Sequence, residues 1–241
     1  MSEVLAIMKK DTLDMFKKGR IFLILLFSIV FSTFLISLLS DSSPILSIGK
    51  KQVMIDTLIT VFLLALTFIV ISIFCEVLFL EERVSGSYEA LFTTPLNIGQ
   101  IITGKALASF AFSYVMAITA VTGMLISLFI NRSLFLIPSI LGFVGVFVSI
   151  PFFSFSFVRL YGTLMFSIKN IQNLYVFRYI FIFGGIFGIS KSIPIILKYT
   201  TPEYLVFGIN VTLLITGTII LIITNILISK ISNEEILMRC Q

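Results

Sequence analysis

The chain of 241 residues contains no histidine and no tryptophan, and only two cysteines and six prolines. Without histidine, this chain cannot build an imidazole metal site, a His-dependent catalytic triad or an imidazole proton relay. Cys75 lies in an apolar run and Cys240 near the C-terminus, and no CxxC motif is present, so neither a disulfide between them nor a zinc site is expected. The sequence therefore predicts no catalytic, metal-binding or cofactor-binding residues on this chain.

Charged residues are also scarce, at 12% of the chain, while apolar residues make up 58%. A soluble domain is about a quarter charged and near half apolar. A soluble fold with so many Leu, Ile and Phe side chains would leave large apolar patches exposed. The composition is therefore that of a membrane protein.

Six segments are long and apolar enough to cross a membrane as helices, which requires about 20 residues each. They are predicted at 21–39, 53–80, 106–130, 134–158, 174–190 and 204–229. The stretch 188–203 is apolar but contains Pro194 and Pro202, so a broken or re-entrant outer hairpin fits it better than a full span. The predicted fold class is an all-α membrane protein with a single transmembrane domain over residues 1–241.

The 17 lysines and arginines are distributed unevenly over the predicted loops. An even number of spans places both termini on one side, and cytoplasmic loops carry the excess of Lys and Arg. With both termini inside, 12 of these residues are cytoplasmic and 5 are external, namely Lys50, Lys51, Arg132, Lys191 and Lys198. We therefore predict a multi-pass protein of the cell membrane with both termini cytoplasmic. The net charge of +5 then requires no nucleic-acid partner.

Residues 1–20 predict an amphipathic helix before the first span. Such a helix is expected to lie in the cytoplasmic interface of the membrane. The alternative, a solvated tail, would expose its apolar stripe. That stripe consists of Val4, Leu5, Met8, Met15 and Phe16, and Lys10, Asp14 and Lys17 lie opposite it.

The loop 81–105 is the longest polar stretch and is predicted to be cytoplasmic. A short helix is expected to begin at Gly86, with Glu89 in its first turn, and to stop before Pro95. Thr94 is a good N-cap for the following helix, with Pro95 as its first residue, and that helix continues into the third span. A short surface helix between two long ones can carry force between the membrane and a partner beneath it.

The segment GQIITGKA at 99–106 has the glycine and lysine spacing of a phosphate-binding P-loop. A working P-loop needs a preceding strand and a Ser or Thr after the lysine to hold magnesium, whereas Ala106 follows Lys105. The residues between the glycines favour a helix that enters the bilayer. We therefore expect no ATP binding here and interpret Lys105 as snorkelling to the lipid headgroups.

One pattern runs through the whole loop: an acidic-basic pair, a Gly with Glu three residues later, apolar residues, Thr-Pro and finally Gly-Lys. It resembles the first cytoplasmic loop of type 2 ABC exporter permeases. Ser87 and Tyr88 depart from that family's usual Thr and Leu, and Phe92 from the second of its two leucines. The matching residues are Glu82, Arg83, Gly86, Glu89, Leu91, Thr94, Pro95, Gly104 and Lys105.

The resemblance implies partners. In that family a six-span permease pairs with a second permease, and its short loop helix sits in a groove of a separate ATPase subunit. By this likeness the chain would bind ABC ATPase subunits and a second permease chain, identical or different, and ATP and Mg²⁺ would sit on the ATPase alone. The N-terminal amphipathic helix would be the family's interfacial connecting helix. The coupling helix would consist of Gly86, Ser87, Tyr88, Glu89, Ala90, Leu91 and Phe92.

Ionisable side chains inside a predicted span are candidates for function, because an unpaired buried charge is costly. Glu76 is the clear case, and it could pair with Arg178 or Arg20, or reach water. We favour a structural ion pair over a proton-relay carboxylate. Asp56 and Arg159 lie near the ends of their predicted spans and are interpreted as interface residues.

Together these features predict the transmembrane permease subunit of an ATP-driven exporter, which is not an enzyme by itself. The spans offer mainly Phe, Leu, Ile, Ser and Thr, which favours lipophilic or amphipathic cargo, with amphipathic peptides as the best guess from the exporters it resembles. Phe-rich spans could equally reflect lipid-facing surface. The alternative function is a channel or secondary transporter without an ATPase partner, which would need paired intramembrane charges or inverted repeats.

Overall fold

The structure, a computed structural model, describes residues 2–17, 48–80, 82, 97–132, 139–167 and 202–230. Within these ranges all elements are helical, and four helices are long and apolar enough to cross a membrane. Both findings agree with the predicted class of an all-α membrane protein. The predicted spans 21–39 and 174–190 and the loop helix 86–92 lie outside the described residues, as does the outer hairpin up to residue 201.

The four candidate membrane-spanning helices correspond to the second, third, fourth and sixth predicted spans. Each begins or ends some residues beyond the predicted limits, because helices continue past the apolar segment that sequence reasoning detects. The elements are α1 (Ser2–Lys17), α3 (Ile48–Cys75) with the π-helix η1 (Glu76–Leu80), α6 (Ile98–Arg132), α7 (Ile140–Val144) with the π-helix η2 (Gly145–Ser149) and α8 (Ile150–Ser167), and α10 (Pro202–Lys230).

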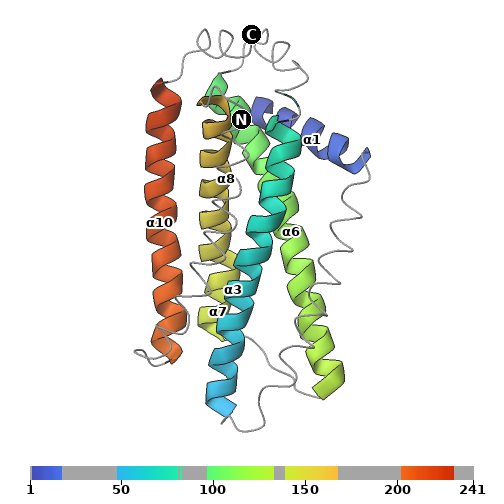
Figure 1. Cartoon of the computed structure of the whole chain (residues 1–241), viewed down its shortest axis with the longest axis vertical. Helices are drawn as coiled ribbons and strands as arrows, with labels where there is room; N and C mark the ends of the chain where they lie inside the picture. The colour runs from blue at the N-terminus through green and yellow to red at the C-terminus, as the bar shows by residue number, and fades with distance from the viewer. Residues whose placement is uncertain are drawn as a thin grey trace.

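The long helices stand side by side, and α1 lies across one end of the bundle against α6 (Figure 1). In the most apolar stretch of α3, 72% of the residues are buried, compared with 17% in α10. Helix α3 is therefore central, and α10 packs at the edge, mainly against α8. We call the two ends of the bundle the α1 end and the Ser139 end.

Phenylalanines interlock the three central helices. Phe68 of α3 packs edge-on against Phe153 and Phe157 of α8, with ring centroids 5.6 and 4.7 Å apart. Phe110 of α6 meets Phe155 of α8 at 6.1 Å, again edge-on. Such edge-to-face pairs are favoured by the charge distribution of the rings. At these positions the aromatic side chains build the helix contacts and do not merely face lipid.

Glycines permit the closest helix approaches, as expected where lipid gives helices no hydrophobic reason to associate. A Cβ on Gly162 of α8 would lie 2.7 Å from the ring of Phe79 in η1. A Cβ on Gly217 of α10 would lie 2.9 Å from the ring of Phe152 and 3.3 Å from the backbone of Phe153. Larger residues at these glycines would force the helices apart.

Polar side chains from three helices hold α7 and η2 at the Ser139 end. The carboxylate of Asp56 in α3 accepts the backbone N–H of Ser139 at 3.0 Å. The amide of Asn210 in α10 donates to the carbonyl of Leu141 at 2.9 Å, and the hydroxyl of Tyr114 in α6 donates to the carbonyl of Val146. A π-turn disturbs the regular helical ladder, so these side chains supply partners to backbone groups of this segment.

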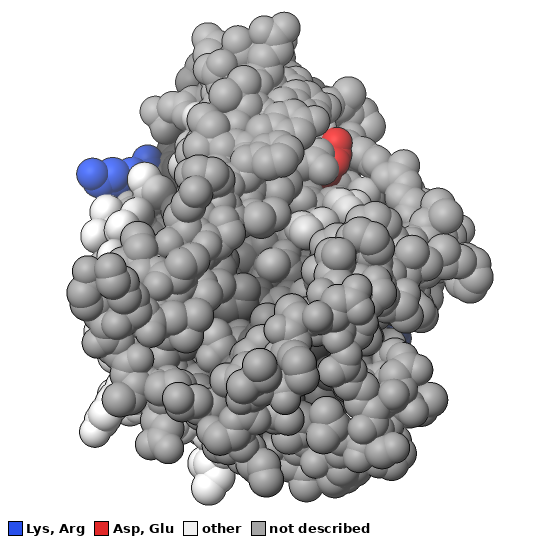
Figure 2. All heavy atoms as spheres, turned by 60° about the horizontal axis from the view of Figure 1, so that its bottom comes forward, with Lys and Arg blue, Asp and Glu red and all other residues white. Residues whose placement is uncertain are grey.

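Asp56, interpreted from the sequence as an ordinary interface residue, is buried within the protein, with 1% of its surface exposed. Its carboxylate holds the start of α7 through the N–H of Ser139. Figure 2 brings the bottom of Figure 1 forward, and the described residues on this face show a basic group and an acidic group well apart. They do not form a charged patch there.

Candidate functional site: the Lys105 network

Helix α6 begins directly after an exposed Asn97, whose carbonyl accepts the N–H groups of Gln100 and Ile101 at 2.8 and 3.1 Å. The side chain of Gln100 returns the contact by accepting the N–H of Asn97 at 2.9 Å. This is one half of a capping box, in which the polar side chain at the third helical position accepts the N–H of the cap residue. The prediction that this helix begins at Pro95 is wrong, because the helix begins three residues later, at Ile98.

Helix α1 crosses α6 at Gly104. A Cβ at this position would lie 3.0 Å from the Cβ of Ile7 and 3.2 Å from the carbonyl oxygen of Val4. Ile7 is buried in this contact. The absence of a side chain at Gly104 thus lets α1 lie directly on the α6 backbone, beside Lys105.

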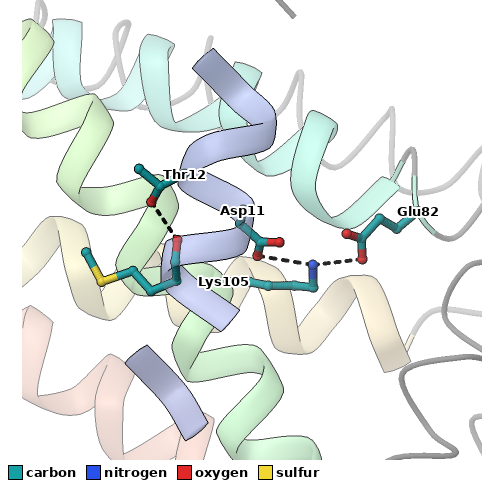
Figure 3. A network of polar contacts seen from close by, with 5 residues as sticks. Asp11, Thr12, Glu82 and Lys105 are labelled. Carbon is teal, nitrogen blue, oxygen red and sulfur yellow. Dashed lines mark hydrogen bonds and ion pairs between the residues drawn. The ribbon is translucent and has the colours of Figure 1, made fainter. Parts of the chain in front are cut away.

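Lys105 connects three parts of the chain that are remote in sequence (Figure 3). Its Nζ lies 2.7 Å from Oε2 of Glu82, which follows η1, and 3.3 Å from Oδ2 of Asp11 in α1. Nζ donates a hydrogen bond to Asp11, whereas the shorter contact with Glu82 lacks hydrogen-bond geometry and is held by opposite charge. One ammonium therefore joins two carboxylates.

The structure corrects the interpretation of Lys105 as a side chain that snorkels to lipid. Only 1% of its surface is exposed, because α1 and the end of the second span cover it. A buried ammonium needs charged partners, and Asp11 and Glu82 supply them. Snorkelling would require an open path to the headgroups, and the packing of α1 over Gly104 closes that path.

The electrostatic balance of this network favours negative charge. Burial raises the pKa of the Asp11 carboxyl, the Lys105 ammonium opposes that rise, and the Glu82 carboxylate adds to it. With all three groups ionised, two negative charges face one positive charge. Lys105 is thus the group on which the stability of the network depends, because its removal would leave two carboxylates in contact without a cation.

The network ties the predicted loop 81–105 to the helices on either side of it. Glu82 lies just after η1 at the start of this loop, and Lys105 lies about two turns inside α6, which begins at Ile98, so their contact joins the end of the second span to α6. Asp11 adds α1 to the same junction. A displacement of the loop would therefore be transmitted to α3, α6 and α1 together.

The other predicted site residues are only partly within the described ranges. Gly86 to Phe92 and Arg178 lie outside them, so the coupling helix and the Glu76–Arg178 pair stay predictions. Glu76 is the first residue of η1 and is partly buried near the α1 end of the bundle. Its interpretation as a structural ion pair remains open.

The segment that resembled a P-loop is part of a regular helix. Residues 99–105 belong to α6, as the prediction of a helix running into the bilayer required. Its lysine, Lys105, forms ion pairs with Asp11 and Glu82. Among the described residues, no group of three or more Cys, Asp and Glu side chains is placed to hold a metal ion.

Sequence reasoning missed Asp11. The predicted apolar stripe of α1 omitted Ile7, although Ile7 and Asp11 are one turn apart and form the face that packs on α6. In the sequence, the apolar Ile7 and the acidic Asp11 lie one turn apart, as Gly104 and Lys105 lie next to each other in α6. This pattern predicts a contact only if α1 is already assumed to pack against α6.

Comparisons with protein-family models, with curated proteins and with solved structures found no match to this chain. The class of protein that the structure itself defines is an all-helical protein with four candidate membrane spans in its described part.

Proposed function

We propose that this chain is the transmembrane permease subunit of an ATP-driven exporter, powered by a separate ATPase that docks on residues 86–92. The observation that carries the proposal is the ion-pair network beside the 81–105 loop. Glu82, at the start of the loop, lies 2.7 Å from Lys105, about two turns inside the helix α6 that follows the loop, and Asp11 ties both to α1. A loop that receives force from a partner needs a rigid attachment to the helices. Without it, the loop would move and the helices would not.

The proposed assembly contains six spans, a second permease chain, and ATP and Mg²⁺ on the ATPase. Both termini and the loop face the cytoplasm in the cell membrane. Support for this part comes from the distribution of Lys and Arg and from the likeness of the loop to type 2 exporter permeases.

The proposed cargo is lipophilic or amphipathic, with amphipathic peptides favoured. Many hydroxyl groups within the bundle donate to carbonyls of their own helix, as Thr67 does to Leu63, Ser113 to Ser109 and Thr224 to Ile220, each at 2.6–2.7 Å. Hydroxyls bonded in this way offer little to a hydrophilic solute. The apolar and aromatic surface that remains suits an amphiphile.

The test is to purify the chain with a candidate ATPase and to measure ATP hydrolysis and peptide transport in nanodiscs and vesicles. Glu89→Lys and Leu91→Asp are expected to abolish the stimulation of hydrolysis by cargo while the chain stays folded. Lys105→Met should also uncouple hydrolysis from transport, whereas Lys9→Met, which removes an exposed lysine of α1, should not.

Two results would contradict the proposal. Stimulation and transport that are unchanged in both loop variants would remove residues 86–92 as the docking helix. Flux through the purified chain without any ATPase would favour the channel or secondary transporter. Equal responses to an amphipathic and a polar peptide of the same length would remove the peptide assignment alone.

A further inference from the structure

Arg159, like Glu76 and Lys105, lies inside a candidate membrane span. Helix α8 does not end near Val158 as predicted but continues to Ser167, and the candidate span covers Ile140–Ser167. Arg159 is therefore followed by about two more helical turns. A charge at such a position is costly unless it has a partner.

The side chain of Arg159 is partly buried, and its Nε is fully buried without a hydrogen-bond partner. The nearest hydroxyls along its own helix donate to backbone carbonyls, and neither accepts from Nε. Ser156 donates to the carbonyl of Phe152 at 2.7 Å, and Thr163 donates to the carbonyl of Arg159 itself at 2.8 Å. Hydroxyl oxygens can still accept, but Nε has none within bonding distance.

The direction of Arg159 follows from its neighbours one and two turns earlier. Phe155 packs against Phe110 of α6, and Phe152 lies against Gly217 of α10. Residues four and seven positions apart share a helix face, so Arg159 is on the face of α8 between α6 and α10. Figure 1 shows α8 standing between these two helices.

The depth of Arg159 follows from helix length. It comes roughly 20 residues after Ile140, which is about the length of helix that crosses a 30 Å hydrocarbon core. Ile140 directly follows Ser139 at the opposite end of the bundle, so Arg159 lies where the hydrocarbon core meets the headgroups at the α1 end. The α1 end is cytoplasmic in the predicted topology, where membranes concentrate anionic lipid.

We infer that Arg159 is a binding site for the phosphate headgroup of an amphiphile that lies against α8 at the α1 end. A guanidinium presents N–H groups in a planar fork that matches a phosphate, and the Arg159 side chain is partly exposed and has an Nε without a hydrogen-bond partner. The ligand is of the phospholipid class. This inference needs only a membrane-embedded chain and does not rest on the permease proposal.

The experiment compares lipid retention by the full-length chain in uncharged detergent, using native mass spectrometry with added phosphatidylglycerol or with diacylglycerol of the same acyl chains, which lacks the phosphate. The wild type should retain phosphatidylglycerol preferentially. Arg159→Gln should bind it about tenfold more weakly or worse, as expected for the loss of a charge-assisted hydrogen bond. Arg159→Lys should retain part of the preference, since it keeps the charge but not the fork.

Lys230→Gln is the matched control, because it removes an exposed positive charge of α10 at the α1 end of the bundle and leaves the sequence of α8 unchanged. It should leave the preference unchanged. Retention by Arg159→Gln equal to that of the wild type overturns the site. If that variant does not fold, retention by Arg159→Lys equal to that of the wild type overturns it.

A competition arm separates a lipid headgroup from free phosphate. Millimolar inorganic phosphate should not displace phosphatidylglycerol, because the acyl chains add apolar burial that free phosphate lacks. Displacement by inorganic phosphate would overturn the assignment to an amphiphile.

Discussion

Lys105 shows how one buried charge can decide the stability of a junction. Its ammonium is 1% exposed and faces two carboxylates, so the three side chains form one electrostatic unit. Replacing one partner of a buried ion pair is far more costly than replacing an exposed charge, because the remaining charge stays without compensation.

We expect Lys105→Met to lower the free energy of unfolding by about 3–5 kcal/mol, since Asp11 and Glu82 would face each other unpaired. Asp11→Asn should cost about 1 kcal/mol or less, because an amide oxygen still accepts from Nζ and one excess negative charge is removed. Unfolding in mixed micelles monitored by circular dichroism measures both. Lys9→Met, an exposed site on α1, should change stability by no more than about 0.5 kcal/mol. A larger loss for Asp11→Asn than for Lys105→Met would contradict this ranking.

The raised pKa of Asp11 predicts a pH dependence of definite sign. Because its pKa lies above the ordinary 3.8, the folded chain binds this proton more strongly than the unfolded chain does. The contribution of Asp11 to stability is therefore fully present below pH 3.8 and is lost as pH rises through the folded pKa. In thermal unfolding, the Tm of the wild type should rise relative to the Tm of Asp11→Asn as the pH is lowered toward that value. If the Tm of the two proteins changed in parallel with pH, burial would not raise the pKa of Asp11.

At the scale of the elements, glycines and polar side chains set which helices touch. Gly104, Gly162 and Gly217 each lie where a Cβ would meet another helix. Polar contacts to the backbone then fix α7 and η2 at the Ser139 end. The glycines and the polar side chains both act on contacts between helices. Neither raises the hydropathy by which a span is recognised in the sequence.

Gly104→Ala should loosen α1, because the new methyl group would lie about 3 Å from Ile7 and from the backbone of Val4. Hydrogen exchange of residues 2–17 should accelerate, while exchange in α3 should stay slow. Gly123→Ala is the matched control in the same helix, since nothing lies within 4 Å of its Cβ. It should be neutral or stabilise the chain by up to about 1 kcal/mol. Equal exchange in the two variants would mean that α1 does not rest on Gly104.

Tyr114→Phe and Asn210→Leu should each cost about 1 kcal/mol, because each removes a side-chain hydrogen bond to a backbone carbonyl of α7 or η2. Exchange of the amides in 139–149 should increase in both variants. Thr212→Val provides the control, since its exposed hydroxyl bonds only to Gly208 of its own helix. If only the overall stability falls and the local exchange does not rise, the two side chains do not hold this segment in place.

At the scale of the whole molecule, the orientation in the membrane comes from charge. The division of Lys and Arg into 12 and 5 predicts that both termini and the 81–105 loop are cytoplasmic. In a background with Cys75 and Cys240 replaced, a membrane-impermeant thiol reagent should label cysteines placed at Lys50 and Lys198 from outside. A cysteine at Gly86 should be labelled only after the membrane is opened. External labelling at Gly86 would overturn the topology.

The sequence by itself determined the membrane class, the approximate positions of four spans and the helical character of the N-terminal segment. Apolar length and helical periodicity are local properties, so they can be read without knowing which helices meet. The site was predicted less well. Lys105 was recognised as a notable residue, but its predicted environment was wrong and its partner Asp11 was missed.

Only the tertiary structure decided the partners of Lys105, the burial of Asp56 and the two π-helices. Asp11 and Lys105 are 94 positions apart, and Asp56 and Ser139 are 83 positions apart. Contacts at such separations depend on how whole helices pack, and an apolar span gives almost the same hydropathy signal whichever side faces a neighbour. The physical reason is that in a membrane both lipid and helix contacts are apolar, so the sequence marks where a helix crosses but not what it touches.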